Sequence, residues 1–268
     1  MASAILADVE PWLPARRRKR RTGESVVIDG HSCHADDASG RQAAALHGRQ
    51  GCLPPHFQTR SKILSRGTVM TRQGVDGLRD QLLAEAQRHG LAQAARVLVV
   101  ADGAIWIWNL TGDRFAQAQQ RLDYYHASQH LWAVAHALHP QDEVQARVWI
   151  RPLLRKLKDG RTPALLSDLR ALAKRLRHKK RQAVENERHY FQEHRHRMDY
   201  TAARRAGEPQ GSGAMESTRR QYQWRFKRPG QFWSCAGDEA WMCLETFWRN
   251  RRWHLLFPHS LQGNPYKN

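Results

Sequence analysis

A short apolar run that ends in an acidic residue and a glycine constrains this chain more than any other feature. The run is Val97–Val100, and Asp102 and Gly103 follow it closely. Four aliphatic residues are too few for a helix and Asp-Gly is a common turn sequence, so this stretch predicts a buried strand that closes in a turn. A carboxylate at the end of a buried strand is costly without a partner, and a divalent metal ion is one such partner. Taken alone, the pair is more often a plain turn.

Three later segments carry acidic residues in recognisable patterns. They read L-D-Y-Y-H at Leu122–His126, R-M-D-Y at Arg197–Tyr200 and G-S-G-A-M-E-S at Gly211–Ser217. Together with D-G-A-I-W-I-W-N at Asp102–Asn109, they resemble, in order, the motifs of the Kra-type insertion-sequence transposases. Those bacterial enzymes have an RNase H-like catalytic core and a D-D-E triad that binds metal ions. The resemblance covers about residues 75–260.

The resemblance implies an α/β fold, in which an RNase H-like mixed sheet is flanked by helices and a helical insertion precedes the catalytic glutamate. Residues 1–60 would form a basic, poorly specified N-terminal region that includes the block Arg16–Arg21. Residues 61–142 would form the first part of the core, 143–205 the helical insertion, and 206–268 the rest of the core with a basic and aromatic helix.

Periodicity gives several elements without the resemblance. It allows a strand in 62–71, and it predicts helices over 75–89, 143–157, 163–177 and 182–205, with Gly90 ending the first. Thr111 is expected to cap a helix that carries Phe115. Residues 121–126 are ambiguous: they can continue that helix, or, as the resemblance implies, form a short strand before a helix over 127–138. Trp248, Trp253 and Phe257 are expected to complete the core.

The resemblance assigns the catalytic residues. Asp102 matches the second aspartate of the triad, and Glu216 matches its glutamate, 114 residues later. Asp123 and His126 match a D-x-x-H element, which would orient the site or touch the scissile phosphate. A structural alternative is a hydrogen-bonded pair that holds the sheet edge to the next helix. Gly211 and Gly213 would let the chain turn tightly into the helix that carries the glutamate.

The first aspartate of the triad is less clearly marked. Asp29 follows Val26-Val27-Ile28, and it is the one acid upstream of residue 75 with an apolar strand sequence before it. The segment that the family carries after its first D-G is not recognisable between His31 and Ser61. The sequence therefore leaves two interpretations open, either Asp29 as the third metal ligand or an altered N-terminal part and an inactive protein.

The expected chemistry is in-line attack on a phosphodiester, first by water and then by a 3′-hydroxyl. Two Mg²⁺ ions, with Mn²⁺ as a substitute, would activate the nucleophile and stabilise the leaving oxygen. Carboxylate oxygens suit these hard cations, which explains a triad built from acids and not from His or Cys. His126 and His130 lack the adjacent acid of an H-E-x-x-H zinc motif.

Charge points to a nucleic-acid partner. The chain has 44 Lys and Arg against 25 Asp and Glu, a net charge of +19, and this excess attracts a polyanion. No apolar run approaches the roughly 20 residues of a membrane-spanning helix, and no apolar segment of the signal-peptide kind follows Arg16–Arg21. Four scattered cysteines favour a reducing compartment. We therefore expect a cytoplasmic protein of the bacterial nucleoid.

Basic and aromatic residues alternate near the C-terminus, a composition suited to phosphate neutralisation with base stacking. The candidate DNA-binding residues are Arg219, Arg220, Trp224, Arg225, Lys227 and Arg228. The expected partners are double-stranded DNA, both element ends and target, and further copies of the chain. Two alternatives stay open: a catalytically inactive, transposase-derived DNA-binding protein, and a basic RNA-binding protein.

Overall fold

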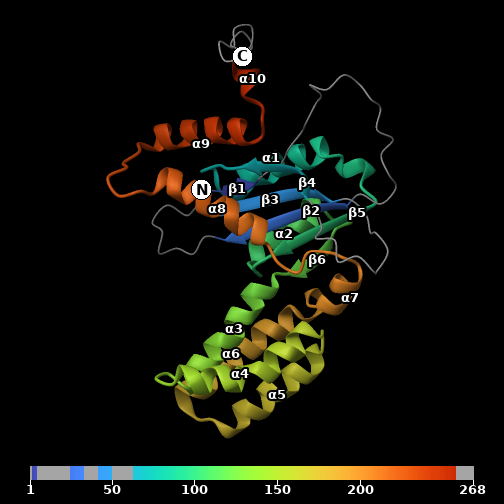
Figure 1. Ribbon diagram of the computed structural model, residues 1–268, viewed down its shortest axis with the longest axis vertical. Helices are drawn as coiled ribbons and strands as arrows, with labels where there is room; N and C mark the ends of the chain where they lie inside the picture. The colour runs from blue at the N-terminus through green and yellow to red at the C-terminus, as the bar shows by residue number, and fades with distance from the viewer. Residues whose placement is uncertain (1, 5–24, 33–41, 50–62, 258–268) are drawn as a thin grey trace, which may run out of the picture. The chain divides into compact units, whose positions relative to one another are not determined.

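The computed structural model describes residues 2–4, 25–32, 42–49 and 63–257, with side chains from Arg66 onward (Figure 1). The basic block Arg16–Arg21 lies outside these residues. The chain divides into two compact units. The first contains residues 1–99, 104–119 and 212–268, and the second contains residues 100–103 and 120–211.

The strands form one mixed sheet. They are β1 (Ala2–Ala4), β2 (Ser25–Ser32), β3 (Gln42–Arg49), β4 (Ile63–Val69), β5 (Arg96–Ala101) and β6 (Gln119–Leu122). Their order is β1-β3-β2-β5-β6, and β4 also pairs with β3. The pairs β2–β3 and β3–β4 are antiparallel, whereas β1 is parallel to β3. The fold class is therefore α/β, and β2 and β5 are neighbours although 63 residues separate Ser32 from Arg96.

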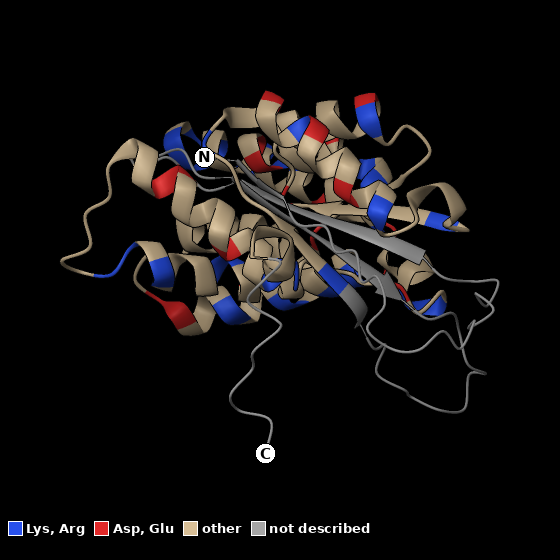
Figure 2. Cartoon of the chain, turned by 90° about the horizontal axis from the view of Figure 1, so that it is seen from above, with Lys and Arg blue, Asp and Glu red and all other residues tan. Residues whose placement is uncertain are grey.

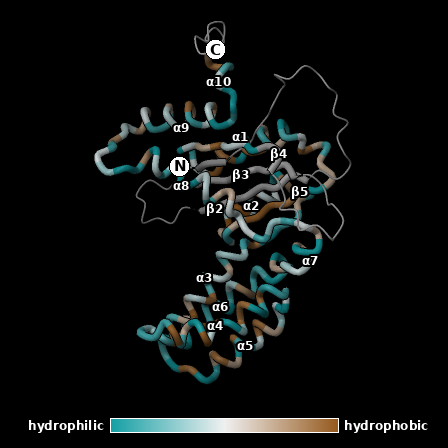
Figure 3. The backbone as a smooth tube through the Cα atoms, viewed as in Figure 1, coloured by the Kyte–Doolittle hydropathy of each residue, from teal (hydrophilic) through white to brown (hydrophobic). Residues whose placement is uncertain are grey.

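β5 confirms the buried strand that the sequence predicts. Every residue from Val97 to Ala101 is buried, as expected for a strand covered on both faces. The hydrophobic colour of this segment in Figure 3 contrasts with the alternating colours of the helices α4 to α6. The predicted strand in 62–71 is also present, as β4.

The helices of the first unit are α1 (Gly74–Arg88), η1 (Leu91–Gln93), α2 (Ile105–Arg114), α8 (Gly213–Phe226), α9 (Cys235–Arg249) and α10 (Trp253–Leu256). α8 packs against β2 and β3, α9 against β4, and α1 against β3, β4 and α2. The aromatic and methionine side chains of α8 and α9 form a buried cluster. It contains Met70, Met215, Tyr222, Phe226 and Met242.

One long-range contact fixes α9 to the sheet. The Asn250 side chain, just after α9, accepts from the main-chain N–H of Thr68 and donates to its carbonyl oxygen, both at 2.7 Å. Asn250 is only 1% exposed. The amide therefore occupies both hydrogen-bonding groups of a β4 residue where water does not reach.

The second unit is helical apart from its sheet residues. It contains α3 (Tyr124–Leu138), α4 (Glu143–Lys158), α5 (Thr162–Arg175), α6 (His178–Glu193), η2 (Arg195–Arg197) and α7 (Tyr200–Arg205). α3 packs against α4 and α6, and α5 packs against α6. The helices α3, α4 and α5 each bury an apolar stripe at helical spacing, for example Leu165, Leu169 and Ala173 in α5. Because α3 belongs to this unit, the unit is wider than the predicted insertion 143–205.

Several predicted elements are confirmed and others are wrong. Gly90, at φ +79°, follows α1 as predicted, and α4 and α5 match their predicted ranges. Thr111 does not cap a helix: it lies within α2, and its hydroxyl donates to the Ile107 carbonyl at 2.7 Å. Residues 119–122 form a strand before a helix, as the resemblance implies, but that helix, α3, begins at Tyr124 and not at residue 127.

Two further predictions are wrong. The single helix over 182–205 is instead α6, η2 and α7, because Asp199 starts a new helix by accepting from the Ala202 N–H at 2.9 Å. Trp248 and Phe257 do not complete the core, since they are 64% and 45% exposed. None of the described helices combines the length and apolar character that crossing a membrane requires.

Candidate functional site

The Asp102-Gly103 turn is held by the helix α6. The Tyr190 hydroxyl donates to the Asp102 carbonyl oxygen at 3.0 Å. Gly103 has φ +100°, and a Cβ there would lie 2.8 Å from Tyr190 Oη and 3.2 Å from His194 Nε2. Glycine is therefore required at 103 for two reasons, its backbone conformation and the close approach of α6. Asp102 itself is 9% exposed.

Aromatic stacking fixes the position of Tyr190. The His130 ring of α3 stacks on the Tyr190 ring with centroids 3.6 Å apart, and His130 Nδ1 lies 2.6 Å from Glu187 Oε2. His194 contacts the Tyr190 ring edge-on at 4.7 Å. The turn that carries Asp102 is thus supported by residues of two packed helices.

The electrostatics of this region are negative. Burial raises the pKa of Tyr190 strongly, and the negative charges of Asp102, Glu187 and Asp123 raise it further. The Tyr190 hydroxyl therefore stays protonated and acts as a hydrogen-bond donor.

His194 is neutral at neutral pH. Burial, and then the positive charge of Arg197, lower its pKa to about 4. Arg197 Nη1 lies 3.1 Å from His194 Nδ1, so the guanidinium donates and Nδ1 accepts. The ring proton is consequently on Nε2, the nitrogen that faces Gly103.

Asp123 connects β5 to α3. Its N–H donates to the Ala101 carbonyl at 2.7 Å, and its Oδ1 accepts from the N–H groups of Tyr125 at 2.6 Å and His126 at 3.2 Å. Asp123 is therefore the N-cap of α3 and is 2% exposed. The Ala101 bond also places the carboxyl ends of β5 and β6 side by side. These contacts match the structural alternative for Asp123, in which it holds the sheet edge to the next helix.

The segment before α8 is anchored to the same region. The main chain of Tyr124 donates to the Gln210 carbonyl at 2.9 Å. Arg121, only 2% exposed, donates to Glu208 at 2.6 Å and to the Pro209 carbonyl at 2.9 Å. A buried arginine that satisfies both an acid and a carbonyl positions this segment firmly.

Gly211 and Gly213 do not form the tight turn that the sequence predicts before α8. A Cβ at Gly211 would lie 2.7 Å from Tyr125 Cδ2, so this position is restricted by close packing. A Cβ at Gly213 would meet nothing within 4 Å. Neither is among the glycines with positive φ, so no left-handed turn leads into α8.

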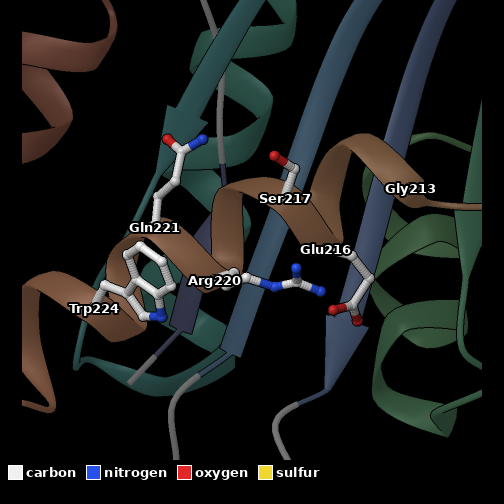
Figure 4. Close-up of a pocket in the computed structure, with 6 residues that line it drawn as sticks. All are labelled: Gly213, Glu216, Ser217, Arg220, Gln221 and Trp224. Atoms are coloured by element: carbon white, nitrogen blue, oxygen red, sulfur yellow. The ribbon is translucent and has the colours of Figure 1, made fainter.

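Glu216 lies in the first turn of α8, as predicted. Its side chain is 41% exposed and lies 3.4 Å from Arg219. It lines a shallow hollow of about 380 Å³ with Gly213, Ser217, Arg220, Gln221 and Trp224 (Figure 4). All of these described residues belong to α8.

The triad residues are distributed over both units. Asp29 lies within β2, paired with Ala45 of β3, and the strand continues to Ser32. Asp29 and Glu216 belong to the first unit and Asp102 to the second. Among the residues whose side chains are described, a range that excludes Asp29, no group of three His, Cys, Asp or Glu is arranged to hold a metal ion.

The basic and aromatic residues near the C-terminus divide between core and surface. Tyr222 and Phe226 are each 3% exposed, whereas Trp224 between them is 64% exposed. Arg225 lies over the Trp241 ring at 5.3 Å, and Arg220 and Arg228 are exposed. Figure 2 shows Lys and Arg on many elements with acidic positions among them. The exposed basic residues of α8 and the following loop are thus available to a polyanion.

Sequence reasoning missed Tyr190 and His194. The signal that could have found them is their spacing of four residues, which places both side chains on one face of a helix. They lie in a segment dense in His and Arg, where composition gives no reason to select these two.

Comparison with protein-family models gives no match, and comparison with curated proteins gives none either.

Proposed function

We propose that this protein is a DNA transposase that cuts and joins strands by two-metal phosphodiester transfer, with Asp102, Glu216 and Asp29 as the metal ligands. The observation that carries the proposal is the position of Asp102. It directly follows β5, in which every residue from Val97 to Ala101 is buried and whose neighbour in the sheet is β2, the strand that contains Asp29. Asp29 is thus on β2, and Asp102 follows the strand next to it in the sheet.

The order of the strands supports an RNase H-like sheet. The successive strands β2, β3 and β4 form an antiparallel meander, and β5 and β6 extend the sheet on the other side of β2. This strand order supports the proposed RNase H-like sheet. α8, which carries Glu216, packs against β2 and β3, and so Glu216 and Asp29 lie on elements in contact.

The donor set fits magnesium. All three proposed ligands are carboxylates, and hard divalent cations prefer such oxygens. When bound, two such ions would activate the attacking oxygen and stabilise the leaving oxygen.

The residues of the chain have distinct tasks in this proposal. Tyr190 holds the Asp102 main chain through its hydroxyl, and Asp123 caps α3 beside it. The exposed Arg220 and Arg228 neutralise phosphates along the strand. In cleavage a water oxygen attacks phosphorus and the 3′-oxygen leaves as a 3′-hydroxyl. In joining, that 3′-hydroxyl attacks the phosphorus of a second phosphodiester, whose own 3′-oxygen leaves. No covalent bond to the protein forms.

The test is cleavage and joining of linear duplexes that carry the DNA flanking the gene, with Mg²⁺ or Mn²⁺. We expect Asp102→Asn, Glu216→Gln and Asp29→Asn each to abolish cleavage while salt-sensitive DNA binding remains. Asp76→Asn is the matched control, because the Asp76 side chain is 93% exposed on α1. Loss with only the first two variants would place the third ligand elsewhere.

The same assay separates the two alternatives. A wild-type protein that binds duplex DNA without cutting it would be an inactive, transposase-derived binding protein. Tighter binding to structured RNA than to duplex DNA would favour an RNA-binding function. Concentration-dependent size on DNA ends, measured by light scattering, tests the proposed oligomer.

A further inference from the structure

One face of α8 carries an acid, a cation and an exposed aromatic ring at regular spacing. Glu216, Arg220 and Trp224 are four residues apart, so their side chains lie on one stripe of the helix. Figure 4 shows the Arg220 side chain between the other two, extending toward Glu216 and away from the Trp224 ring. At about 1.5 Å per residue, the stripe from Glu216 to Trp224 is about 12 Å long.

The packing of α8 keeps Trp224 exposed. Tyr222 and Phe226, on the opposite face, are each 3% exposed and belong to the buried cluster with Met215 and Met242. Rotating the helix to bury Trp224 would remove these two rings from the core. Trp224 therefore stays 64% exposed as a consequence of the fold, and the stripe is held in place before any ligand binds.

The chemistry of this stripe fits a nucleotide. An exposed indole offers a flat surface on which a base stacks, and a neighbouring guanidinium offers paired donors for a phosphate. In a duplex, both faces of each base are covered by its neighbours. Only an unpaired nucleotide, at a strand end or extruded from the helix, can present a base face to Trp224.

We propose that the α8 stripe binds an unpaired nucleotide of DNA, with its base on Trp224 and its phosphate on Arg220. That this nucleotide belongs to the strand being cut rests on the proposed function, because Glu216 is at the other end of the stripe. Base stacking tolerates any sequence, so the stripe selects unpaired structure and not a particular base.

The experiment compares binding to two DNAs of equal length in EDTA, where metal-dependent cleavage cannot occur. One is fully paired and the other has three unpaired nucleotides at a 3′ end, with 2-aminopurine as one of them. We expect wild type to prefer the unpaired end about 5- to 100-fold and to change the 2-aminopurine fluorescence. Trp224→Ala should lose both effects and Trp224→Phe should retain most of them.

The chain offers a closely matched control. Trp248, on α9, is 64% exposed, the same fraction as Trp224. Trp248→Ala should bind as wild type does, and Arg220→Ala should weaken binding to the unpaired end more than Arg220→Lys. Because Trp224 is exposed, its replacement should leave the unfolding midpoint unchanged.

Three results would overturn the inference: no preference for unpaired ends in wild type, an unchanged preference in Trp224→Ala, or an equal loss in Trp248→Ala. Tighter binding of a matching RNA overhang would assign the stripe to RNA and would also overturn it. The readout is independent of cleavage. A preference for unpaired ends without cleavage would contradict the proposed transposase activity and support nucleotide binding by the stripe. Cleavage without the preference would support the transposase activity and contradict nucleotide binding by the stripe.

Discussion

Replacing Gly103 by alanine tests whether close packing of α6 fixes the Asp102 turn. The new Cβ would lie 2.8 Å from Tyr190 Oη and 3.0 Å from Tyr190 Cε2, and it would adopt φ +100°. The Tyr190 hydroxyl would have to move away and would lose its hydrogen bond to the Asp102 carbonyl. We therefore expect a substantial loss in the free energy of unfolding.

The magnitude follows from three contributions. An unfavourable backbone conformation costs about 1–3 kcal/mol, and the lost hydrogen bond costs about 1 kcal/mol. The smaller conformational freedom of alanine in the unfolded chain returns about 0.4–1 kcal/mol. The net expectation for Gly103→Ala is a destabilisation of about 1–3.5 kcal/mol.

Urea unfolding followed by circular dichroism measures this change. Gly112→Ala is the control, since Gly112 lies in α2 with nothing within 4 Å of the new Cβ. There alanine should stabilise the protein by about 0.5–1 kcal/mol. In a Tyr190→Phe background, the Gly103→Ala cost should fall by about 1 kcal/mol, because the displaced hydroxyl is absent. The reasoning would be refuted if Gly103→Ala destabilised the protein by less than about 0.5 kcal/mol. It would also be refuted if the effects of Gly103→Ala and Tyr190→Phe were fully additive.

Four further changes test the contacts around the site and in the sheet. Asp123→Asn should keep the α3 cap, whereas Asp123→Ala should lower the free energy of unfolding by about 1 kcal/mol. If the stable Asp123→Asn variant loses cleavage activity, the carboxylate has a chemical role. The pKa of His194 is lowered to about 4 in the folded protein, so neutral His194 contributes fully to the free energy of unfolding above pH 6.5, and this contribution is lost as pH falls through 4. In urea unfolding, His194→Gln should therefore remove up to about 3 kcal/mol of this pH dependence. Arg121→Met should destabilise by about 3–5 kcal/mol in the same assay, since it leaves a carboxylate partner without its cation. Asn250→Ala should lower stability by about 2–4 kcal/mol, as two buried hydrogen bonds to Thr68 are lost, and a calorimetric midpoint equal to wild type would contradict this.

Local patterns predicted the elements whose signal is periodic. β5 follows from its uninterrupted aliphatic run, and α4 and α5 follow from apolar positions at helical spacing. α2 was missed because Ile105, Trp106, Ile107 and Trp108 have low intrinsic helix propensity, and packing of the Ile107 and Trp108 face overrides it. The break after α6 depends on a cap at Asp199, within a sequence that periodicity alone would continue.

Burial was the least predictable property of the aromatic residues. Trp224 and Tyr222 are two positions apart in one helix, yet one is exposed and the other is in the core. Trp248 was expected in the core on composition alone, although exposed apolar residues are common on protein surfaces. The support of Asp102 by Tyr190 was equally hidden, since 88 residues separate the two partners in sequence.

Structural contacts account for the residue type at several of the motif positions. Gly103 and Gly211 are restricted by neighbouring side chains, and Asp123 caps α3. The hydrogen bond from Tyr190 goes to the main chain of Asp102 and would form with any residue there. The ion pair between Glu216 and Arg219 is largely exposed and contributes little to stability. In the proposed function, a divalent cation would bind the carboxylate of Asp102 just after the buried residues of β5.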